Sequence, residues 1–121
     1  MPNTAVHILV QLTIHDGQQD ALRSVAQEMT AGSQAEAGTL GYEWYFSVDG
    51  KQCRLLETYA DAGALLAHFN GPVVQQLVPK MLPYVALDAF EVYGDPGAEA
   101  GAMLANFGAR LFAHWRGLKR G

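Results

Sequence analysis

Hydrophobic and polar residues alternate along the first part of the chain, between Ala5 and Ile14. Every second residue there is a branched aliphatic one: Val6, Ile8, Val10, Leu12 and Ile14. This period of two is typical of a β-strand with one buried face. The segment His15-Asp16-Gly17 is expected to end the strand.

The spacing changes to three and four residues between Gln18 and Gln34. The apolar residues of this segment are Ala21, Leu22, Val25, Ala26 and Met29. Such spacing places them on one face of an amphipathic helix. The sequence therefore predicts a strand followed by a helix.

A hairpin is predicted next, because Asp49-Gly50 separates two segments rich in aromatic and β-branched residues. With these two residues as the turn, the facing pairs are Val48–Lys51, Phe46–Cys53, Tyr45–Arg54, Trp44–Leu55 and Tyr42–Glu57. Residues that face each other share a side of the sheet. The core side is then expected to carry Leu40, Tyr42, Trp44, Phe46, Cys53, Leu55, Glu57 and Tyr59. One ionisable acid on such an aromatic face indicates either a core with polar members or a pocket.

The following segment is predicted to add a helical region and a strand. Asp61 is a suitable N-cap for a short helix through Phe69, which Gly71-Pro72 ends. Val73 to Met81 is apolar enough for further helical turns, and Tyr84 to Tyr93 is strand-like. This strand is expected to have Phe90 and Val92 on one face, and Leu87, Ala89 and Tyr93 on the other. The order β-α-β-β-α-β is typical of an α+β, ferredoxin-like fold with an antiparallel sheet.

Gly94-Asp95-Pro96-Gly97 is expected to separate this unit, residues 1–95, from a C-terminal extension, residues 96–121. Apolar residues of the extension recur every four positions: Met103, Phe107, Leu111 and Trp115, with Leu104 and Phe112 beside them. The spacing predicts an extra amphipathic helix, packed either on its own subunit or across a dimer.

Two helices cover only one face of a four-stranded sheet. The other face is expected to carry Tyr45, Leu56 and further apolar residues of the outer strands. An open apolar face with free edges favours aggregation. Two sheets paired face to face would cover it, so we expect a homodimer formed through the open sheet face.

Composition narrows the classes of function. The chain has 121 residues, 50% of them hydrophobic, which suits one globular core. Its net charge of −4 argues against a nucleic-acid partner, and no apolar segment reaches the ~20 residues of a membrane span. The single cysteine, Cys53, excludes an internal disulfide, and the N-terminus lacks a signal-peptide pattern, so we expect a cytoplasmic protein. The histidines show no ligand-like spacing, so no metal site is expected.

Several motifs resemble the antibiotic biosynthesis monooxygenase domain family, whose members form dimeric α+β barrels. They are the glycine-led strand Glu36-Ala-Gly-Thr-Leu-Gly-Tyr42-Glu-Trp44, the Asp49-Gly50 turn, the strand end Leu56-Glu57-Thr-Tyr59-Ala-Asp61 and the helix segment Ala64-Leu-Leu-Ala-His68. The resemblance spans residues 5–94 and leaves the predicted C-terminal helix outside. It implies the same fold and the same dimeric assembly.

The family's characterised enzymes oxidise quinol- or anthrone-type aromatics with dioxygen, without a metal or a flavin. The resemblance thus implies a cofactor-independent monooxygenase of a quinol-like or polycyclic phenolic substrate. A haem-degrading branch uses an Asn, a Trp and a helix histidine that ligates the iron. His68 falls where that branch has its histidine. The first strand, however, offers Leu9, Gln11 or Thr13 where the branch has its Asn, which argues against haem degradation.

Oxygenation without a cofactor requires a base that deprotonates a bound aromatic in a dry cavity, and donors that stabilise the anion. His68 or Glu57 is the expected catalytic base, because histidine titrates near neutrality and burial raises the pKa of a carboxyl group. The residues expected to line the substrate pocket are Tyr42, Trp44, Tyr59 and Phe69.

Structural roles stay open for the same residues. His68 could bond only a neighbouring carbonyl group or Glu57, and Glu57 could be satisfied by the Tyr42 hydroxyl or a backbone N–H. Trp44 could be an ordinary core residue.

Two alternative functions stay open for the protein. One is a non-catalytic barrel that binds a small hydrophobic ligand or serves as a subunit of an assembly. The other, less favoured, is haem binding through His68.

Overall fold

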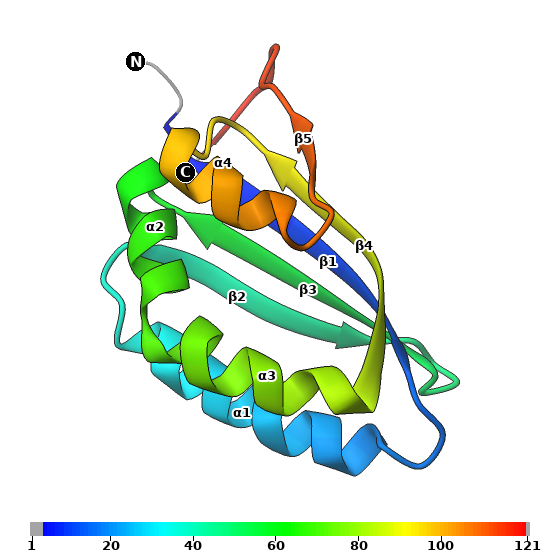
Figure 1. Ribbon diagram of the computed structural model, residues 1–121. Helices are drawn as coiled ribbons and strands as arrows, with labels where there is room; N and C mark the ends of the chain where they lie inside the picture. The colour runs from blue at the N-terminus through cyan, green and yellow to red at the C-terminus, as the bar shows by residue number, and fades with distance from the viewer. Residues whose placement is uncertain (1–3, 121) are drawn as a thin grey trace.

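The computed structural model describes residues 4–120 as one sheet with helices packed on it (Figure 1). The elements of the first unit are β1 (Val6–Ile14), α1 (Gln19–Gln34), β2 (Thr39–Phe46), β3 (Gln52–Tyr59), α2 (Ala62–Asn70) and β4 (Val85–Tyr93). Between α2 and β4 the chain forms three short helical segments: η1 (Val73–Leu77), α3 (Val78–Met81) and η2 (Leu82–Tyr84). This order confirms the β-α-β-β-α-β arrangement and the α+β class.

The sheet has the strand order β2-β3-β1-β4-β5, in which the last strand, β5 (Arg110–Phe112), belongs to the C-terminal segment. The pairs among the first four strands are antiparallel, and β4 and β5 are parallel. Helices α1, α2 and α3 lie on one face of the sheet (Figure 1). The buried side chains of β1 alternate as predicted, and they form the core together with apolar residues of these helices.

The hairpin register agrees with the prediction. Tyr42 faces Glu57, Trp44 faces Leu55, and Phe46 faces Cys53. One residue of the predicted core side is misplaced: Leu40 is 62% exposed. The register shifts between Thr39 and Gly41, and Leu40 is the extra residue at this irregularity, so it points away from the core.

A second irregularity changes the orientation of Leu87, which was expected on the side opposite Phe90. The register between β1 and β4 shifts between Gln11 and Leu12, so that Leu12 pairs with Leu87 while Val10 pairs with Phe90. A one-residue shift moves a side chain to the other face of a strand. Leu87 therefore borders the space beneath the helices, together with Phe90.

The predicted extra C-terminal helix is present as α4 (Ala98–Ala105), but it does not extend through Trp115. Helix α4 has fewer residues than predicted, and a turn at Gly108 with φ +69° follows it. The N–H groups of Gly108 and Ala109 donate to carbonyl groups of the last helical turn, which is a common way to end a helix at glycine. The chain then enters β5 instead, and Trp115 is exposed.

The opposite face of the sheet carries the exposed side chains of Tyr45 and Leu56, as predicted. The homodimer expected from this face stays a prediction. Among residues 4–120, no helix combines the length and the apolar character needed to cross a lipid bilayer.

Candidate active site

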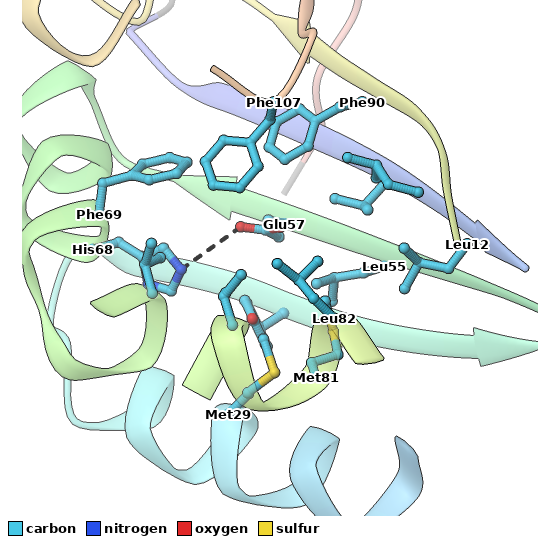
Figure 2. A pocket seen from close by; sticks show the side chains of 15 residues that line it. Leu12, Met29, Leu55, Glu57, His68, Phe69, Met81, Leu82, Phe90 and Phe107 are labelled. Atoms are coloured by element: carbon cyan, nitrogen blue, oxygen red, sulfur yellow. Dashed lines mark ion pairs between the residues drawn. The ribbon is translucent and has the colours of Figure 1, made fainter. Parts of the chain in front are cut away.

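A small cavity lies between the sheet and the helices (Figure 2). Its volume is about 50 Å³. Most of its lining is aliphatic or phenyl, and its polar members are Tyr42, Glu57 and His68. Leu82 and Leu87, both partly exposed, mark the side that opens to solvent. The cavity is thus an apolar space with a small cluster of ionisable groups at one wall.

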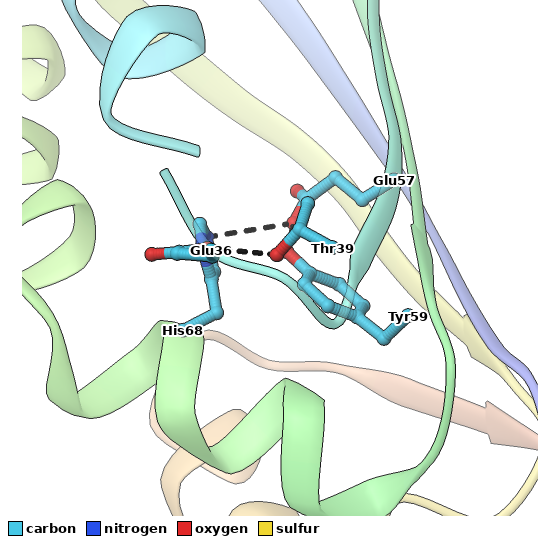
Figure 3. Close-up of polar contacts among 5 residues, drawn as sticks. All are labelled: Glu36, Thr39, Glu57, Tyr59 and His68. Atoms are coloured by element: carbon cyan, nitrogen blue, oxygen red, sulfur yellow. Dashed lines mark hydrogen bonds and ion pairs between the residues drawn. The ribbon is translucent and has the colours of Figure 1, made fainter. Parts of the chain in front are cut away.

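His68 is held between two acidic side chains. It lies on α2 and is buried, with its Nδ1 atom 2.7 Å from Oε1 of Glu36. Its Nε2 atom is 3.9 Å from Oε1 of Glu57 (Figure 3). Since a carboxylate only accepts hydrogen bonds, Nδ1 carries a proton toward Glu36. In the neutral imidazole, the lone pair of Nε2 then faces Glu57, on the wall of the cavity.

Glu36 lies in the loop between α1 and β2, and its side chain is mostly buried. The same oxygen that accepts from His68 also accepts from the hydroxyl of Thr39, at 2.7 Å. Two donors on one oxygen hold the carboxylate in a fixed position. Glu36 therefore fixes the orientation of the His68 ring.

Glu57 lies on β3 and is buried. Burial raises its pKa, although His68 and a hydrogen bond from Tyr59 oppose this effect. The Tyr59 hydroxyl donates to Oε1 of Glu57. A carboxyl group with a raised pKa in an apolar environment is a proton donor, because the charged form is the one that burial penalises.

The structure brings four of the six predicted site residues to the cavity wall: His68, Glu57, Tyr42 and Phe69. The centroids of the Tyr42 and His68 rings are 5.7 Å apart. Burial, more than any neighbouring charge, raises the pKa of Tyr42, so its hydroxyl stays protonated.

Tyr59 and Trp44 are not among the residues that line the cavity. Tyr59 is fully buried behind Glu57 and supports it by the hydrogen bond described above. Trp44 points to α1, where its Nε1 donates to the Thr30 hydroxyl at 2.9 Å. It borders an outer groove that also contains Arg23 and Phe46. Tyr59 was predicted to supply pocket surface, but in the structure its role is to support Glu57. Trp44 belongs to the outer groove and not to the cavity.

Sequence reasoning missed two contributors. Glu36 was not a candidate, because nothing local relates it to His68, 32 residues further along the chain. Phe107, in the turn after α4, borders the cavity, although its segment was predicted to be a regular helix. For Glu36, the only sequence indication is its place at the start of the glycine-led segment that precedes β2.

The described part of the chain contains no group of three His, Cys, Asp or Glu side chains arranged to hold a metal ion. Of the described residues that line the cavity, none is Lys or Arg. An anion formed in the cavity would therefore depend on protonated His68 and on neutral donors for its stabilisation.

Comparison with known proteins agrees with this fold. The family model described as antibiotic biosynthesis monooxygenase matches residues 5–80. MupZ from Pseudomonas fluorescens has the same fold with a TM-score of 0.86 and 21% identity, over 98% of this chain and 96% of its own. Rv0793 from Mycobacterium tuberculosis also has this fold, with a TM-score of 0.61 and 24% identity, over 78% of this chain and 98% of its own.

A variant of SnoaB, a cofactor-independent oxygenase from Streptomyces nogalater, is also similar. Its TM-score is 0.68 at 12% identity, over 78% of this chain and 96% of its own. At these identities the likeness to solved structures concerns the fold alone. No curated protein matches the sequence.

Proposed function

The chain belongs to the antibiotic biosynthesis monooxygenase family, and from this we propose that it oxidises a small quinol-like phenol with dioxygen, without a metal or an organic cofactor. One observation carries the proposal: an apolar cavity has the Nε2 atom of His68 and the carboxyl group of Glu57 at its wall, 3.9 Å from nitrogen to oxygen. This arrangement can remove a proton from a bound aromatic and keep water away from the resulting anion.

In the proposed reaction, Nε2 of His68 takes a proton from the substrate hydroxyl. The electron-rich ring anion passes one electron to dioxygen, and the two radicals combine into a carbon–oxygen bond. Protonation of the distal oxygen gives a ring hydroperoxide. The same carbon then loses its hydrogen as a proton while the O–O bond breaks, so that water leaves and a carbonyl group remains on that carbon. One oxygen atom of dioxygen ends in the product and the other in water.

Glu57 and Glu36 have different parts in this proposal. Glu57, whose raised pKa favours the protonated form, is placed to donate to the developing oxyanion or peroxide. Glu36 accepts from Nδ1 of His68 and stabilises the imidazolium formed by proton transfer. The base is therefore His68 rather than Glu57.

The volume of the cavity favours a small substrate. An apolar protein cavity of roughly 150 Å³ holds one benzene molecule. The cavity here, at about 50 Å³, must widen even for one ring. The partly exposed Leu82 and Leu87 side chains offer room for such widening. A one- or two-ring quinol is therefore proposed in preference to a larger polycyclic phenol.

Oxygen uptake with menadiol, measured with an electrode in the presence of EDTA, tests this function. Uptake above the uncatalysed rate is expected, and it should fall about 100-fold in His68→Gln, the range typical of a lost general base. Glu57→Gln keeps the shape but cannot donate its proton, so a smaller decrease is expected. His7→Gln, on the other face of the sheet, is the matched control and should keep full activity.

Two results would contradict the proposal. Uptake that disappears with EDTA would show that a metal is required. Turnover that is the same in His68→Gln, Glu57→Gln and the unchanged protein would remove the assigned site.

A non-catalytic barrel that binds a small hydrophobic ligand is the second candidate, favoured by the small volume of the cavity. It predicts ligand binding without any oxygen uptake. Haem binding has less support, because both ring nitrogens of His68 face carboxyl groups and the cavity is far too small for a porphyrin.

We also propose that the protein is a homodimer formed through its open sheet face. Tyr45 is 54% and Leu56 42% exposed there, which leaves two large apolar side chains of the hairpin in water. Sedimentation equilibrium is expected to give a dimer. Leu56→Glu should shift it toward the monomer, and Leu40→Glu, at the register shift on the edge strand, should not.

A further inference from the structure

We propose that Phe107 determines which ring systems the cavity accepts, so that the C-terminal segment is a working part of the site. This inference rests on the proposed function, because it concerns the substrate of the same cavity. Phe107 lies outside residues 5–80, the part that the family model matches. Its effect would therefore come from a segment that the family model does not describe.

Phe107 is the middle one of a row of three phenylalanine rings. Its ring stacks on that of Phe90, with centroids 5.6 Å apart and an angle of 19° between the planes. The centroids of the Phe107 and Phe69 rings are 6.2 Å apart, and the angle between their planes is 45°. Figure 2 shows the three rings side by side along one wall of the cavity, opposite Met29 and Met81. Phe107 thus contacts both other rings, and it comes from a separate segment of the chain.

The backbone holds Phe107 in place through the last turn of α4 and through the turn after it, where the N–H groups of Gly108 and Ala109 donate to the carbonyl groups of Ala105 and Leu104. The Phe107 N–H donates to the carbonyl of Leu104, and Leu104 and Ala100 anchor α4 in the core. Next to Phe107 the space is open, because a Cβ atom at Gly108 would meet no other atom within 4 Å. Phe107 itself is only partly buried. The ring can therefore change position without any change in the anchored helix.

Apart from Leu82 and Leu87 at the open side, the walls of the cavity offer less freedom. Glu57 and His68 are fixed by hydrogen bonds or by burial, and Phe69 and Phe90 belong to a helix and a central strand. A ligand ring that is larger than the cavity would have to displace one of the wall residues that are partly exposed. Phe107 meets this condition, and its contacts with the other two rings make any displacement costly. This cost would discriminate between ring systems by size.

The test is equilibrium binding, measured by calorimetry under nitrogen so that no oxygenation takes place. The ligands are phenol, 2-naphthol and anthrone, with one, two and three rings. In Phe107→Ala, affinity for anthrone should rise at least tenfold relative to phenol, because the lost ring leaves space. In Phe107→Trp, the ratio should move the other way. Phe112→Ala is the matched control: that ring stacks on Tyr93, away from the cavity.

The possible outcomes separate this inference from the proposed function. Equal affinity ratios in Phe107→Ala, Phe112→Ala and the unchanged protein would overturn the role of Phe107 even if oxygen uptake is observed. Binding that follows the predicted ratios without any oxygen uptake would support Phe107 and contradict the monooxygenase. Absence of binding of all three ligands to every variant, with normal circular dichroism, would overturn both.

Discussion

The Nδ1 atom of His68 lies 2.7 Å from Oε1 of Glu36, across 32 positions of sequence. The contact joins α2 to the loop before β2 and decides which nitrogen of the imidazole faces the cavity. It is the relationship on which the proposed base depends. We therefore expect changes at Glu36, which lines no part of the cavity, to alter activity.

Glu36→Gln should lower the rate of menadiol oxidation at least ~10-fold, because the neutral amide stabilises the imidazolium less than a carboxylate does. Glu36→Asp, which keeps the charge, should restore part of the rate. Nitrogen NMR of the His68 ring should show the proton on Nδ1 in the unchanged protein and a mixture of tautomers in Glu36→Gln. Glu28→Gln, which removes a carboxylate from the surface pair with Lys80, serves as the control. Equal rates in the two variants would contradict the role of Glu36.

The raised pKa of Glu57 predicts how stability depends on pH. Above the unfolded value of about 4.3, the unfolded chain loses the Glu57 proton while the native protein keeps it. The native state then binds more protons, so the free energy of unfolding falls as pH rises, by up to ~1.4 kcal/mol per pH unit, until the native pKa is passed. Urea unfolding between pH 4.5 and 8 should show this slope. The slope should vanish in Glu57→Gln and persist in Glu43→Gln, an exposed acid on β2.

Two tyrosines allow a matched comparison of buried and more exposed hydrogen bonds. Tyr59 donates to Glu57, and Tyr93 donates to Glu91 at 2.5 Å, each across two positions of one strand. Tyr59→Phe should lower the free energy of unfolding by ~1–3 kcal/mol, since it leaves a buried acceptor without its donor. Tyr93→Phe should change it by less than ~0.5 kcal/mol. Similar losses in the two variants would show that Glu57 finds another donor.

Glycine substitutions test how closely α2 packs on the loop before β2. A Cβ atom at Gly38 would lie 2.4 Å from Cβ of Ala64, so Gly38→Ala should destabilise the protein by ~1–3 kcal/mol. A Cβ atom at Gly101, in α4, meets nothing within 4 Å. Gly101→Ala should therefore add ~0.5–1 kcal/mol, the usual gain of alanine within a helix. Chemical unfolding of the two variants checks both values, and a stable Gly38→Ala protein would contradict the close packing.

Local patterns predicted most of the first unit. The Asp49-Gly50 turn placed Tyr42 opposite Glu57 correctly, because register in a hairpin follows from the turn. Asp61 caps α2 as expected: its side chain accepts from the N–H of Ala64 at 2.8 Å. The errors at Leu40 and Leu87 have one cause. Both lie beside register shifts, which depend on how neighbouring strands fit together and leave no mark in the alternation of residues.

The C-terminal segment was misjudged because a four-residue period does not distinguish a long helix from a short helix followed by a strand. The helix ends early, before Gly108, and the residues that follow form a strand that pairs with β4. The site was predicted only in part for a similar reason. His68 and Glu57 are distinctive as polar residues among apolar ones, whereas the contact between His68 and Glu36 arises from tertiary packing alone.

The parallel pairing of β5 with β4 has a consequence for any shortened form of the protein. A chain that stops at residue 95 would lose β5, α4 and the Phe107 ring together. The edge of β4 would then be free to pair with other chains, and Phe69 and Phe90 would face water at an unsealed end of the cavity. The segment after Gly94 is therefore both the border of the sheet and the closure of its interior.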